Sequence, residues 1–548
     1  MQAVKKVICF VLLLAFLMPA FAQPKNKFPE RPSLVVGIVV DQMREDYLQR
    51  YQQHFVKGGF RRFLKDGFSF RNCRYSYLPT YTAPGHASIF SGTTPAVHGI
   101  VGNSWLSASG TPVYCTRDDT ARGIGTDGKA GKMSPAQMNA GSVADQVRLA
   151  GNFRGKAFGI SFKDRGAILP AGHAANAAFW FDFSSGNFIS SSWYRELKGT
   201  LPGWLQQFNK QGPVKSCLDS VWRPLLPLPA YTASDADNRP WEKPLIPGRD
   251  PVFPYALKAA GGPEKLAATP FGNQVLSQLA LELIGQEGLG SDSIMDFLSV
   301  SFSSPDIIGH AYGPNSIENE DCYLRLDRDL EKLFRFLDRK VGEGRWLCFL
   351  TADHGAMEVP GFLNQHQIPA RHFSEEQTLD SLRTWSVKTT GKDWFAGLEN
   401  LQLYLKQDFF ALPLTEQEQL KCQFISRLEK FPGINRAFAL SGQKPWPESP
   451  HLDKVSAGFY KSRSGHIQIL TDPFYLNQLS PQGTTHGSPH AYDTHVPCLW
   501  LGWKVAAGEE LRPVSIEDIA PTLSSLVRIP FPNASTGKPQ AILLKPQP

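Results

Sequence analysis

The sequence predicts an α/β protein built on a doubly wound, mostly parallel sheet that is sandwiched by helices. Three largely apolar runs of strand length carry this prediction: Ser33–Val40, Ile294–Phe302 and Trp346–Leu350. Such runs are typical of strands buried on both faces of a parallel sheet. Segments with helical apolar spacing separate them, such as 326–337, where leucine recurs every three or four residues. This alternation favours helices on both faces of the sheet.

The remaining core elements follow from the same patterns. We predict, in chain order, helices at Phe60–Asp66, Ala83–Ser91 and 141–150, a strand at Lys156–Ser161, a helix from Thr269 to Ile284, a strand at Val496–Gly502 and a closing helix at Ile516–Val527. The 548 residues exceed what one simple core usually holds, so insertions are expected.

The predicted core comprises residues 31–170, 266–360 and 481–548. The range 171–265 is dense in aromatic residues and proline. We interpret it as an insertion that forms a smaller cap subdomain and begins with a hairpin at Ala177–Tyr194. Residues 361–480 break the alternation again and form a second insertion, with a helix near Thr415–Lys430 and a strand at His466–Leu470.

The N-terminus has the pattern of a cleavable signal peptide. Lys5 and Lys6 precede an apolar run from Val7 to Leu17, and small residues follow up to Ala22. We predict that residues 1–22 are removed near Ala22 and that the mature chain is periplasmic or secreted. No later stretch is long and apolar enough to cross a bilayer, so stable membrane insertion is not expected. Loss of two lysines lowers the formal charge from +7 to +5, and no basic block indicates a nucleic-acid partner.

Polar residues with metal-ligand chemistry lie next to the predicted strands. Asp41 follows the first run, at the edge where open α/β sheets bind ligands, although an ordinary loop aspartate would look the same. Asp306 and His310 are four residues apart, so on a helix they share one face and can bind one metal ion. Asp353 and His354 directly follow a strand. His486 lies among small residues before the last strand, and His490 and His495 are nearby alternatives.

A second group of residues suits a phosphate. Thr82 stands at the start of the helix Ala83–Ser91, where unpaired N–H groups and the helix dipole favour an anion. Taken alone, a threonine at this position is far more often only an N-cap. Lys163 and Arg165 are two apart, so in an extended segment they project from one face toward one phosphate; the same residues could also form a solvated turn. Imidazole and carboxylate ligands without thiolate suit Zn²⁺, and a two-metal site suits phosphoryl transfer.

The ordered set of Asp41, the run Thr82–His86, Asp306 with His310, the run Thr351–Gly355 and His486 resembles the alkaline phosphatase superfamily. Asn103 and the Lys163–Arg165 run resemble its phosphate-irrepressible bacterial alkaline phosphatases. The resemblance covers the core and the order of its elements, and it implies an alkaline-phosphatase-like fold.

The resemblance also implies two Zn²⁺ ions per subunit. One would be bound by Asp306, His310 and His486, and the other by Asp41, Asp353 and His354, with the Thr82 hydroxyl touching the second ion as nucleophile. Asn103, Lys163 and Arg165 would hold the phosphoryl oxygens. The expected protein is a monomeric exported alkaline phosphatase that hydrolyses small phosphate monoesters through a phosphothreonine.

Two other functions stay open at this point. Nucleotide pyrophosphatases/phosphodiesterases of the same superfamily share the threonine and zinc pattern. A non-catalytic exported zinc-dependent binding protein would be expected to lack a ligand or the nucleophile, and none is missing. Sulfatases place Cys or Ser, then Arg four residues on, where this chain has Thr82 and His86, so sulfatase activity is not expected.

Overall fold

The computed structural model describes residues 28–440, 448 and 451–544. The predicted signal peptide and its cleavage near Ala22 lie outside these residues.

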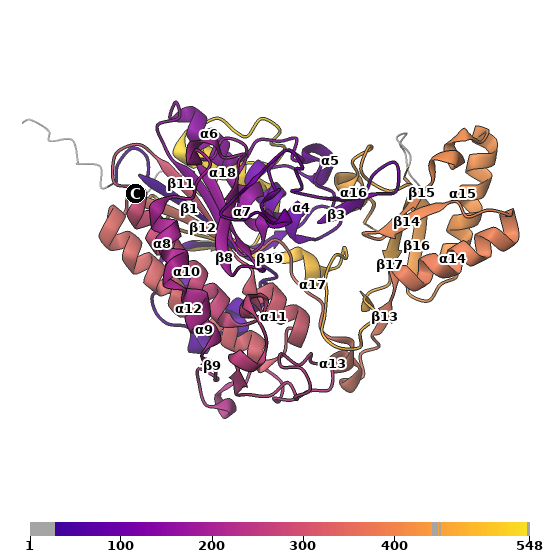
Figure 1. Cartoon of the computed structure of the whole chain (residues 1–548), viewed down its shortest axis with the longest axis horizontal. Helices are drawn as coiled ribbons and strands as arrows, with labels where there is room; N and C mark the ends of the chain where they lie inside the picture. Colours follow the sequence, from indigo (N-terminus) through magenta and orange to yellow (C-terminus); the bar gives the residue numbers. More distant parts are fainter. Residues whose placement is uncertain (1–27, 441–447, 449–450, 545–548) are drawn as a thin grey trace, which may run out of the picture.

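The core is a twisted sheet in the order β20-β2-β19-β12-β1-β11-β6-β7-β8-β5, with β21 also paired to β2 (Figure 1). Its strands are β1 (Leu34–Val40), β2 (Phe68–Arg74), β5 (Gly123–Ile124), β6 (Ala157–Ser161), β7 (Ala177–Asp182), β8 (Asn187–Ser191), β11 (Asp296–Phe302), β12 (Trp346–Thr351), β19 (His495–Gly502), β20 (Gly508–Glu510) and β21 (Val514–Ser515). The central strands β12, β1, β11, β6 and β7 run parallel. The predicted mostly parallel α/β fold is confirmed.

Register brings the ends of the central strands together. Val40, the last residue of β1, pairs with Phe302, the last residue of β11, and Val39 pairs with Thr351 of β12. Asp41, Asp353 and the start of the helix after β11 therefore lie at one edge of the sheet. β19 runs antiparallel to β12, so the loop that precedes it reaches the same edge.

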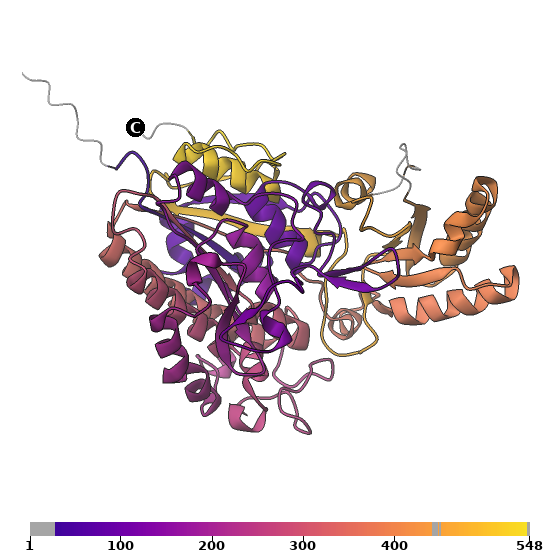
Figure 2. The same ribbon diagram turned by 45° about the horizontal axis from the view of Figure 1, so that its top comes forward.

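Helices cover both faces of the sheet, as predicted (Figures 1 and 2). One face carries α4 (Thr82–Ser91), α6 (Val143–Ala150), α7 (Asp164–Ala171) and α18 (Ile519–Val527), which pack on one another. The other carries α3 (Phe60–Asp66), α10 (Pro270–Gln286), α11 (Ser304–Tyr312) and α12 (Ile317–Leu337). Short helices α2 (Tyr47–Arg50), α5 (Pro95–His98) and α17 (Ala491–Thr494) lie in the connections.

The first part of the range 171–265 belongs to the main sheet. The hairpin expected at its start is β7 and β8, but β7 pairs in parallel with β6 and extends the main sheet. The aromatic residues of β7 and β8 pack into the main core, where the Phe181 ring lies 4.5 Å from that of Phe162. The rest of the range forms α8 (Gly203–Gln211), α9 (Pro213–Leu218), the strand pair β9 (Val221–Trp222) and β10 (Tyr255–Ala256), and long loops.

Residues 375–440 and 451–471 form a side lobe with its own apolar core, seen in orange in Figures 1 and 2. Its elements are α14 (Glu375–Thr390), α15 (Leu414–Leu428), α16 (Leu452–Gly458) and a sheet of β14 (Phe395–Glu399), β15 (Gln402–Leu405), β17 (Ile467–Thr471) and β16 (Ile434–Ala439). The predicted helix near Thr415–Lys430 and strand at His466–Leu470 are α15 and β17. The helix α13 (Pro360–Gln365) and two strand pairs lie beside the lobe. One pair is β3 (Ser104–Leu106) and β4 (Pro112–Tyr114), and the other is β13 (Arg371–Phe373) and β18 (Tyr475–Asn477).

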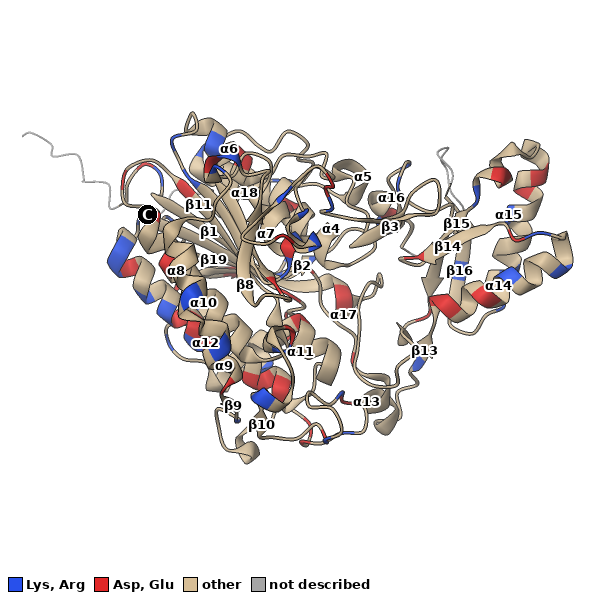
Figure 3. Ribbon diagram, viewed as in Figure 1, with Lys and Arg blue, Asp and Glu red and all other residues tan. Residues whose placement is uncertain are grey.

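Lysine and arginine are spread over many elements and form no continuous basic stripe in the view of Figure 3. Within the described residues, every helix is too short or too polar to cross a membrane.

Candidate metal and phosphoryl site

The predicted metal ligands meet at the carboxyl edge of the central strands. Asp41 directly follows β1, Asp306 and His310 lie on α11, Asp353 and His354 follow β12, and His486 lies in the loop before β19. Ligand atoms of Asp41, Asp353 and His354 form one group in which all lie within 4.8 Å of one another. Those of Asp306, His354 and His486 form a second such group.

The second group differs from the expected set of Asp306, His310 and His486, because His354 lies between the two groups. His310 is nevertheless close, with its Nε2 3.1 Å from Asp306 Oδ1, while His486 Nε2 is 3.7 Å from the same oxygen. All six predicted ligands therefore lie in one cluster. The alternative ligand His495 lies apart, where its Nε2 donates to the carbonyl of Arg71 at 2.9 Å; His490 is in neither group.

Hydrogen bonds hold the three histidines in the orientation that metal ligands need. The Nδ1 of His310 donates to the Thr484 carbonyl at 2.7 Å and that of His486 to the Thr80 carbonyl at 2.7 Å. The Nδ1 of His354 likewise donates to the Gly355 carbonyl at 3.0 Å. Each ring therefore presents an Nε2 lone pair, in the way that metal-binding histidines are usually fixed.

Three fully buried ligand atoms fit a metal ion directly. Asp41 Oδ1, Asp353 Oδ2 and His354 Nε2 have no hydrogen-bond partner within the described part of the chain. Burial lowers the pKa of His354 to about 4, which keeps its ring neutral and able to bind a cation. Burial, and then the nearby Asp41, raise the pKa of Asp353 well above its usual range. Unpaired buried groups of this kind are rare in proteins, and a bound cation would satisfy them.

Lys163 joins the two groups. Its Nζ lies 2.6 Å from Asp41 Oδ2, 2.6 Å from Asp306 Oδ2 and 3.5 Å from Thr82 Oγ1. Burial alone would lower the pKa of Lys163, but the charges of Asp306 and Asp41 raise it. The residue is the N-cap of α7 and Arg165 is already helical, so the extended segment assumed for this pair is wrong.

Arg165 is held from another element. Its Nη1 donates to the Tyr114 hydroxyl at 3.0 Å, and that hydroxyl donates to Asp164 Oδ1 at 2.7 Å. Arg165 Nε is buried and has no partner among the described residues. Lys163, at the N-cap of α7, and Arg165, in its first turn, are thus held by separate partners.

Thr82 is the first residue of α4 and is 1% exposed. The predicted helix is confirmed and starts one residue earlier than expected. Asn103 lies beside this start, where its Oδ1 accepts a hydrogen bond from the Ala83 amide at 2.9 Å. Behind it, His86 Nδ1 donates to the Thr82 carbonyl at 2.8 Å, and burial lowers the pKa of His86 to about 4.

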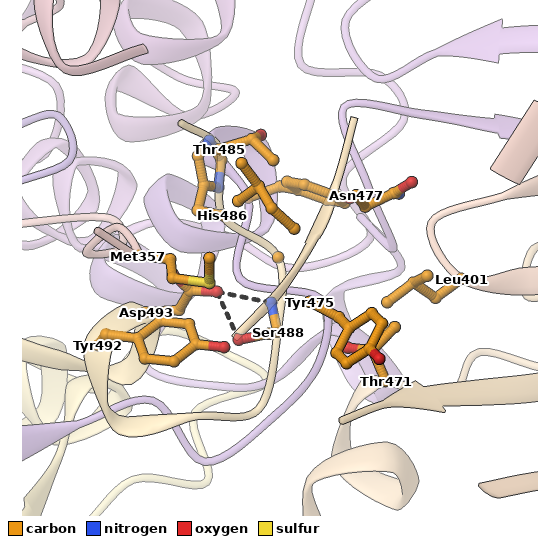
Figure 4. Close-up of a pocket in the computed structure, with 13 residues that line it drawn as sticks. Met357, Leu401, Thr471, Tyr475, Asn477, Thr485, His486, Ser488, Tyr492 and Asp493 are labelled. Carbon is orange, nitrogen blue, oxygen red and sulfur yellow. Dashed lines mark hydrogen bonds between the residues drawn. The ribbon is translucent and has the colours of Figure 1, made fainter. Parts of the chain in front are cut away.

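A pocket borders the site on the side of the lobe (Figure 4). Its lining combines Tyr81 and His486 from the core with Leu401 and Tyr475 from the side lobe or its margin. At its floor Asp493 Oδ2 accepts hydrogen bonds from the amide and hydroxyl of Ser488 at 2.8 and 2.6 Å. The pocket therefore lies between the candidate ligand His486 and residues Leu401 and Tyr475 of the lobe and its margin.

Sequence reasoning missed several supporting residues. Gln42 donates from Nε2 to Asp306 Oδ1 at 2.6 Å and from its backbone amide to Asp353 Oδ1 at 3.1 Å. Its position directly after Asp41 was the only available signal. Asp493 accepts the Gly355 amide on its carbonyl at 2.8 Å, which ties the His486 loop to the end of β12. Neither Asp493 nor Tyr114 carries a local pattern that predicts this role.

Comparison with known proteins places this site in a family. The family model for type I phosphodiesterases and nucleotide pyrophosphatases matches residues 35–493. The chain is 42% identical over 526 residues to alkaline phosphatase PafA of Elizabethkingia meningoseptica, covering 94% of this chain and 95% of the relative. It is 40% identical over 555 residues to alkaline phosphatase PhoV of Synechococcus elongatus, covering 98% and 100%.

The crystal structure of PafA superimposes with a TM-score of 0.89 at 41% identity, covering 94% of this chain and 99% of the other. A PafA variant with substitutions at one threonine, one asparagine, one lysine and one arginine gives a TM-score of 0.88 at 40% identity, with the same coverage. The chain belongs to the type I phosphodiesterase/nucleotide pyrophosphatase family, a branch of the alkaline phosphatase superfamily. Within that superfamily it is an alkaline phosphatase.

Proposed function

We propose that this alkaline phosphatase is exported and hydrolyses small phosphate monoesters at a two-zinc site through a phosphothreonine on Thr82. One observation carries the proposal: unpartnered, buried ligand atoms of Asp41, Asp353 and His354 gather beside the start of α4, where Lys163 Nζ lies 3.5 Å from Thr82 Oγ1. The names of the relatives support phosphatase activity.

Two sets of residues would hold the metal ions. Asp41, Asp353 and His354 would bind one, and Asp306, His310 and His486 the other. The donors are nitrogen and oxygen only, which suits Zn²⁺. When bound, the two ions would supply Lewis acidity for the attacking and leaving oxygens.

The residues of the chain would act in two displacements. In the first, Thr82 Oγ attacks phosphorus, the ester P–O bond breaks and the alcohol leaves with a proton. In the second, water attacks the phosphothreonine, the P–O bond to Thr82 breaks, and inorganic phosphate is released. Splitting the reaction lets one site perform two easier steps. The dipole of α4, whose positive end lies at Thr82, favours the anionic phosphoryl group throughout.

Asn103, Lys163 and Arg165 would bind the phosphoryl oxygens. The substituted PafA variant supports this assignment, because its threonine and asparagine, and its lysine and arginine, have the same separations as Thr82 and Asn103 and as Lys163 and Arg165. A monoester dianion offers these donors more negative charge than a diester does. A diester would leave a buried cation without its partner, which disfavours its binding.

Four measurements on the purified protein test the proposal. Metal analysis should find two zinc ions per chain, and chelation should abolish turnover until zinc is restored. A chromogenic phosphate monoester should be hydrolysed faster than the matching diester, and acid quenching during turnover should trap phosphate on Thr82. A faster diester reaction would assign the protein to the phosphodiesterases, and zinc binding without turnover would assign it to the binding proteins.

Export is tested separately by the N-terminus of the mature protein. Intact mass measurement of protein from the periplasm or the medium should find a chain that begins near Gln23. An intact Met1 form in that fraction would refute removal of the signal peptide.

A further inference from the structure

The segment that carries Asn103 is held by the side lobe. This segment, residues 99–108, runs from the C-cap of α5 through β3. The pair of β3 and β4 reaches the lobe at β14 (Figures 1 and 2). Four hydrogen bonds with lobe side chains join the segment to the lobe.

Two of these bonds are made by the residue directly after Asn103. The Ser104 hydroxyl donates to Glu399 Oε1 at 2.6 Å, and the side-chain amide of Asn400 donates to the Ser104 carbonyl at 2.8 Å. On the other side of Asn103, the backbone of Gly102 lies so close to Asn400 that a Cβ there would be 2.5 Å from Nδ2. Asn103 therefore lies between two residues that the lobe contacts directly.

The other two bonds hold the ends of the segment. Arg463 Nη1 donates to the Gly99 carbonyl at 2.5 Å. Gln407 Nε2 donates to the Ala108 carbonyl at 3.0 Å. The Arg463 guanidinium also lies over the Trp105 ring, 5.0 Å from its centre. The lobe thus contacts the segment at both ends and in its middle.

The contacts with Ser104 come from one tight turn of the lobe. Asn400 and Leu401 connect β14 to β15 and have φ angles of 58° and 57°. This left-handed backbone is typical of two-residue turns between antiparallel strands, and asparagine and glycine adopt it readily. Asn400 is 9% exposed. Its side chain is therefore presented to the segment from a backbone whose shape a glycine could also keep.

We propose that this lobe turn positions Asn103 for binding of the phosphoryl group, and that Glu399 and Asn400 are positioning residues that act through Ser104. The inference rests on the proposed phosphate-binding role of Asn103. It extends that role by making the side lobe part of the support of the active site.

The position of the Asn103 amide depends on the backbone that carries it. Its Oδ1 accepts from the Ala83 amide, and its carbonyl accepts from the Cys115 amide at 3.0 Å. Both donors lie outside the lobe, whereas the adjoining Ser104 is held by the lobe. A small displacement of a group that contacts the reacting atoms can cost a large part of the rate. Loss of the lobe contacts should therefore weaken the contact of Asn103 Nδ2 with phosphate.

The test removes the two lobe side chains while keeping the turn. Asn400→Gly preserves the left-handed backbone and removes the amide. Glu399→Ala removes the acceptor, whereas Glu399→Gln keeps an oxygen that can accept from Ser104. The matched control is Glu429→Ala, which removes a lobe carboxylate that accepts the Ala437 amide at 3.1 Å instead. All proteins are loaded with zinc, and their zinc content and thermal unfolding are compared before kinetics.

The protein that carries both Asn400→Gly and Glu399→Ala should lower kcat/KM for a chromogenic phosphate monoester by about fivefold or more, because two hydrogen bonds are lost. Its inhibition constant for inorganic phosphate should rise as well. Glu399→Gln and Glu429→Ala should stay near the native values. Native kcat/KM in the protein with both changes, or an equal loss in Glu429→Ala, would overturn the proposal.

A double-mutant cycle shows whether the lobe acts through Asn103. In the Asn103→Ala protein, the two lobe changes should cause almost no further loss, because no side chain is left to position. If the protein with both lobe changes unfolds, the cycle is run with Asn400→Gly alone. A full additional loss on top of a large effect of Asn103→Ala would overturn the proposal and leave the role of Asn103 intact. Near-native kcat/KM for Asn103→Ala would refute the assignment of Asn103 itself, and this proposal with it.

Discussion

Two substitutions of Asn103 distinguish its expected role in binding phosphate from its contact with the start of α4. Its Oδ1 accepts the Ala83 amide at 2.9 Å, which leaves the Nδ2 amide to donate to a phosphoryl oxygen beside Thr82. Asn103→Asp keeps an acceptor for Ala83 but replaces the donor by a second carboxylate oxygen. Asn103→Ala removes both. If the donor matters, aspartate must be at least as harmful as alanine, because it also repels the phosphate dianion.

The expected size follows from the lost interaction. A hydrogen bond to a charged group contributes about 1.5–3 kcal/mol, so Asn103→Ala should lower kcat/KM for a monoester by roughly 10-fold to 150-fold. Asn103→Asp should lose as much or more. The assay is steady-state hydrolysis of a chromogenic monoester by zinc-loaded proteins whose thermal unfolding has been compared. Near-native kcat/KM for Asn103→Asp, together with a loss for Asn103→Ala, would show that Asn103 only supports the start of α4.

Three further outcomes are expected. Thr82→Ala should lose on the order of a thousandfold or more in rate and give no phosphoprotein by mass spectrometry, by analogy with other nucleophiles; a near-native rate would exclude Thr82. Replacing Lys163 and Arg165 together by alanine should reduce monoester turnover far more than diester turnover, and equal losses would count against their role. Burial raises the pKa of Asp327 to about 6, so its contribution to stability is present below about pH 4 and is lost as the pH rises through about 6. The stability advantage of the native protein over Asp327→Asn should therefore shrink by about 2–3 kcal/mol between about pH 4 and pH 7 in thermal unfolding, and a constant difference would contradict this.

The sheet and the positions of most candidate ligands on it could be predicted because they depend on local patterns. A strand buried on both faces reads as an apolar run, and parallel strands in register must end at one edge, so Asp41 and Asp353 had to lie near each other. Helical spacing likewise placed Asp306 and His310 on one face of α11. These inferences need only the periodicity of each element and the direction of its strand.

Other features depend on partners far away in the chain. The aromatic residues of β7 could equally have packed a cap or the edge of the main sheet, and only the pairing with β6 decides between them. Lys163 lies at the N-cap of α7. Its side chain is directed by Asp41, directly after β1, and by Asp306 of α11, because these carboxylates accept hydrogen bonds from its amine. Tyr114 orients Arg165 from a separate strand pair. No local spacing encodes such contacts.

The orientation of the candidate histidine ligands depends on the path of the backbone more than on neighbouring side chains. His310, His354 and His486 are each oriented by a backbone carbonyl, and two of those carbonyls, of Thr484 and Thr80, belong to segments remote from the ring that they hold. A carbonyl is present whatever the side chain, so substitutions that preserve the loop path should leave these rings in place. Asp493, in contrast, acts through its side chain as well. Its carboxylate accepts the amide of Ser488, two residues after His486, and its backbone carbonyl accepts the amide of Gly355, next to His354. The side chain of Asp493 therefore helps to fix the path of the His486 loop, and this loop carries the Thr484 carbonyl that orients His310.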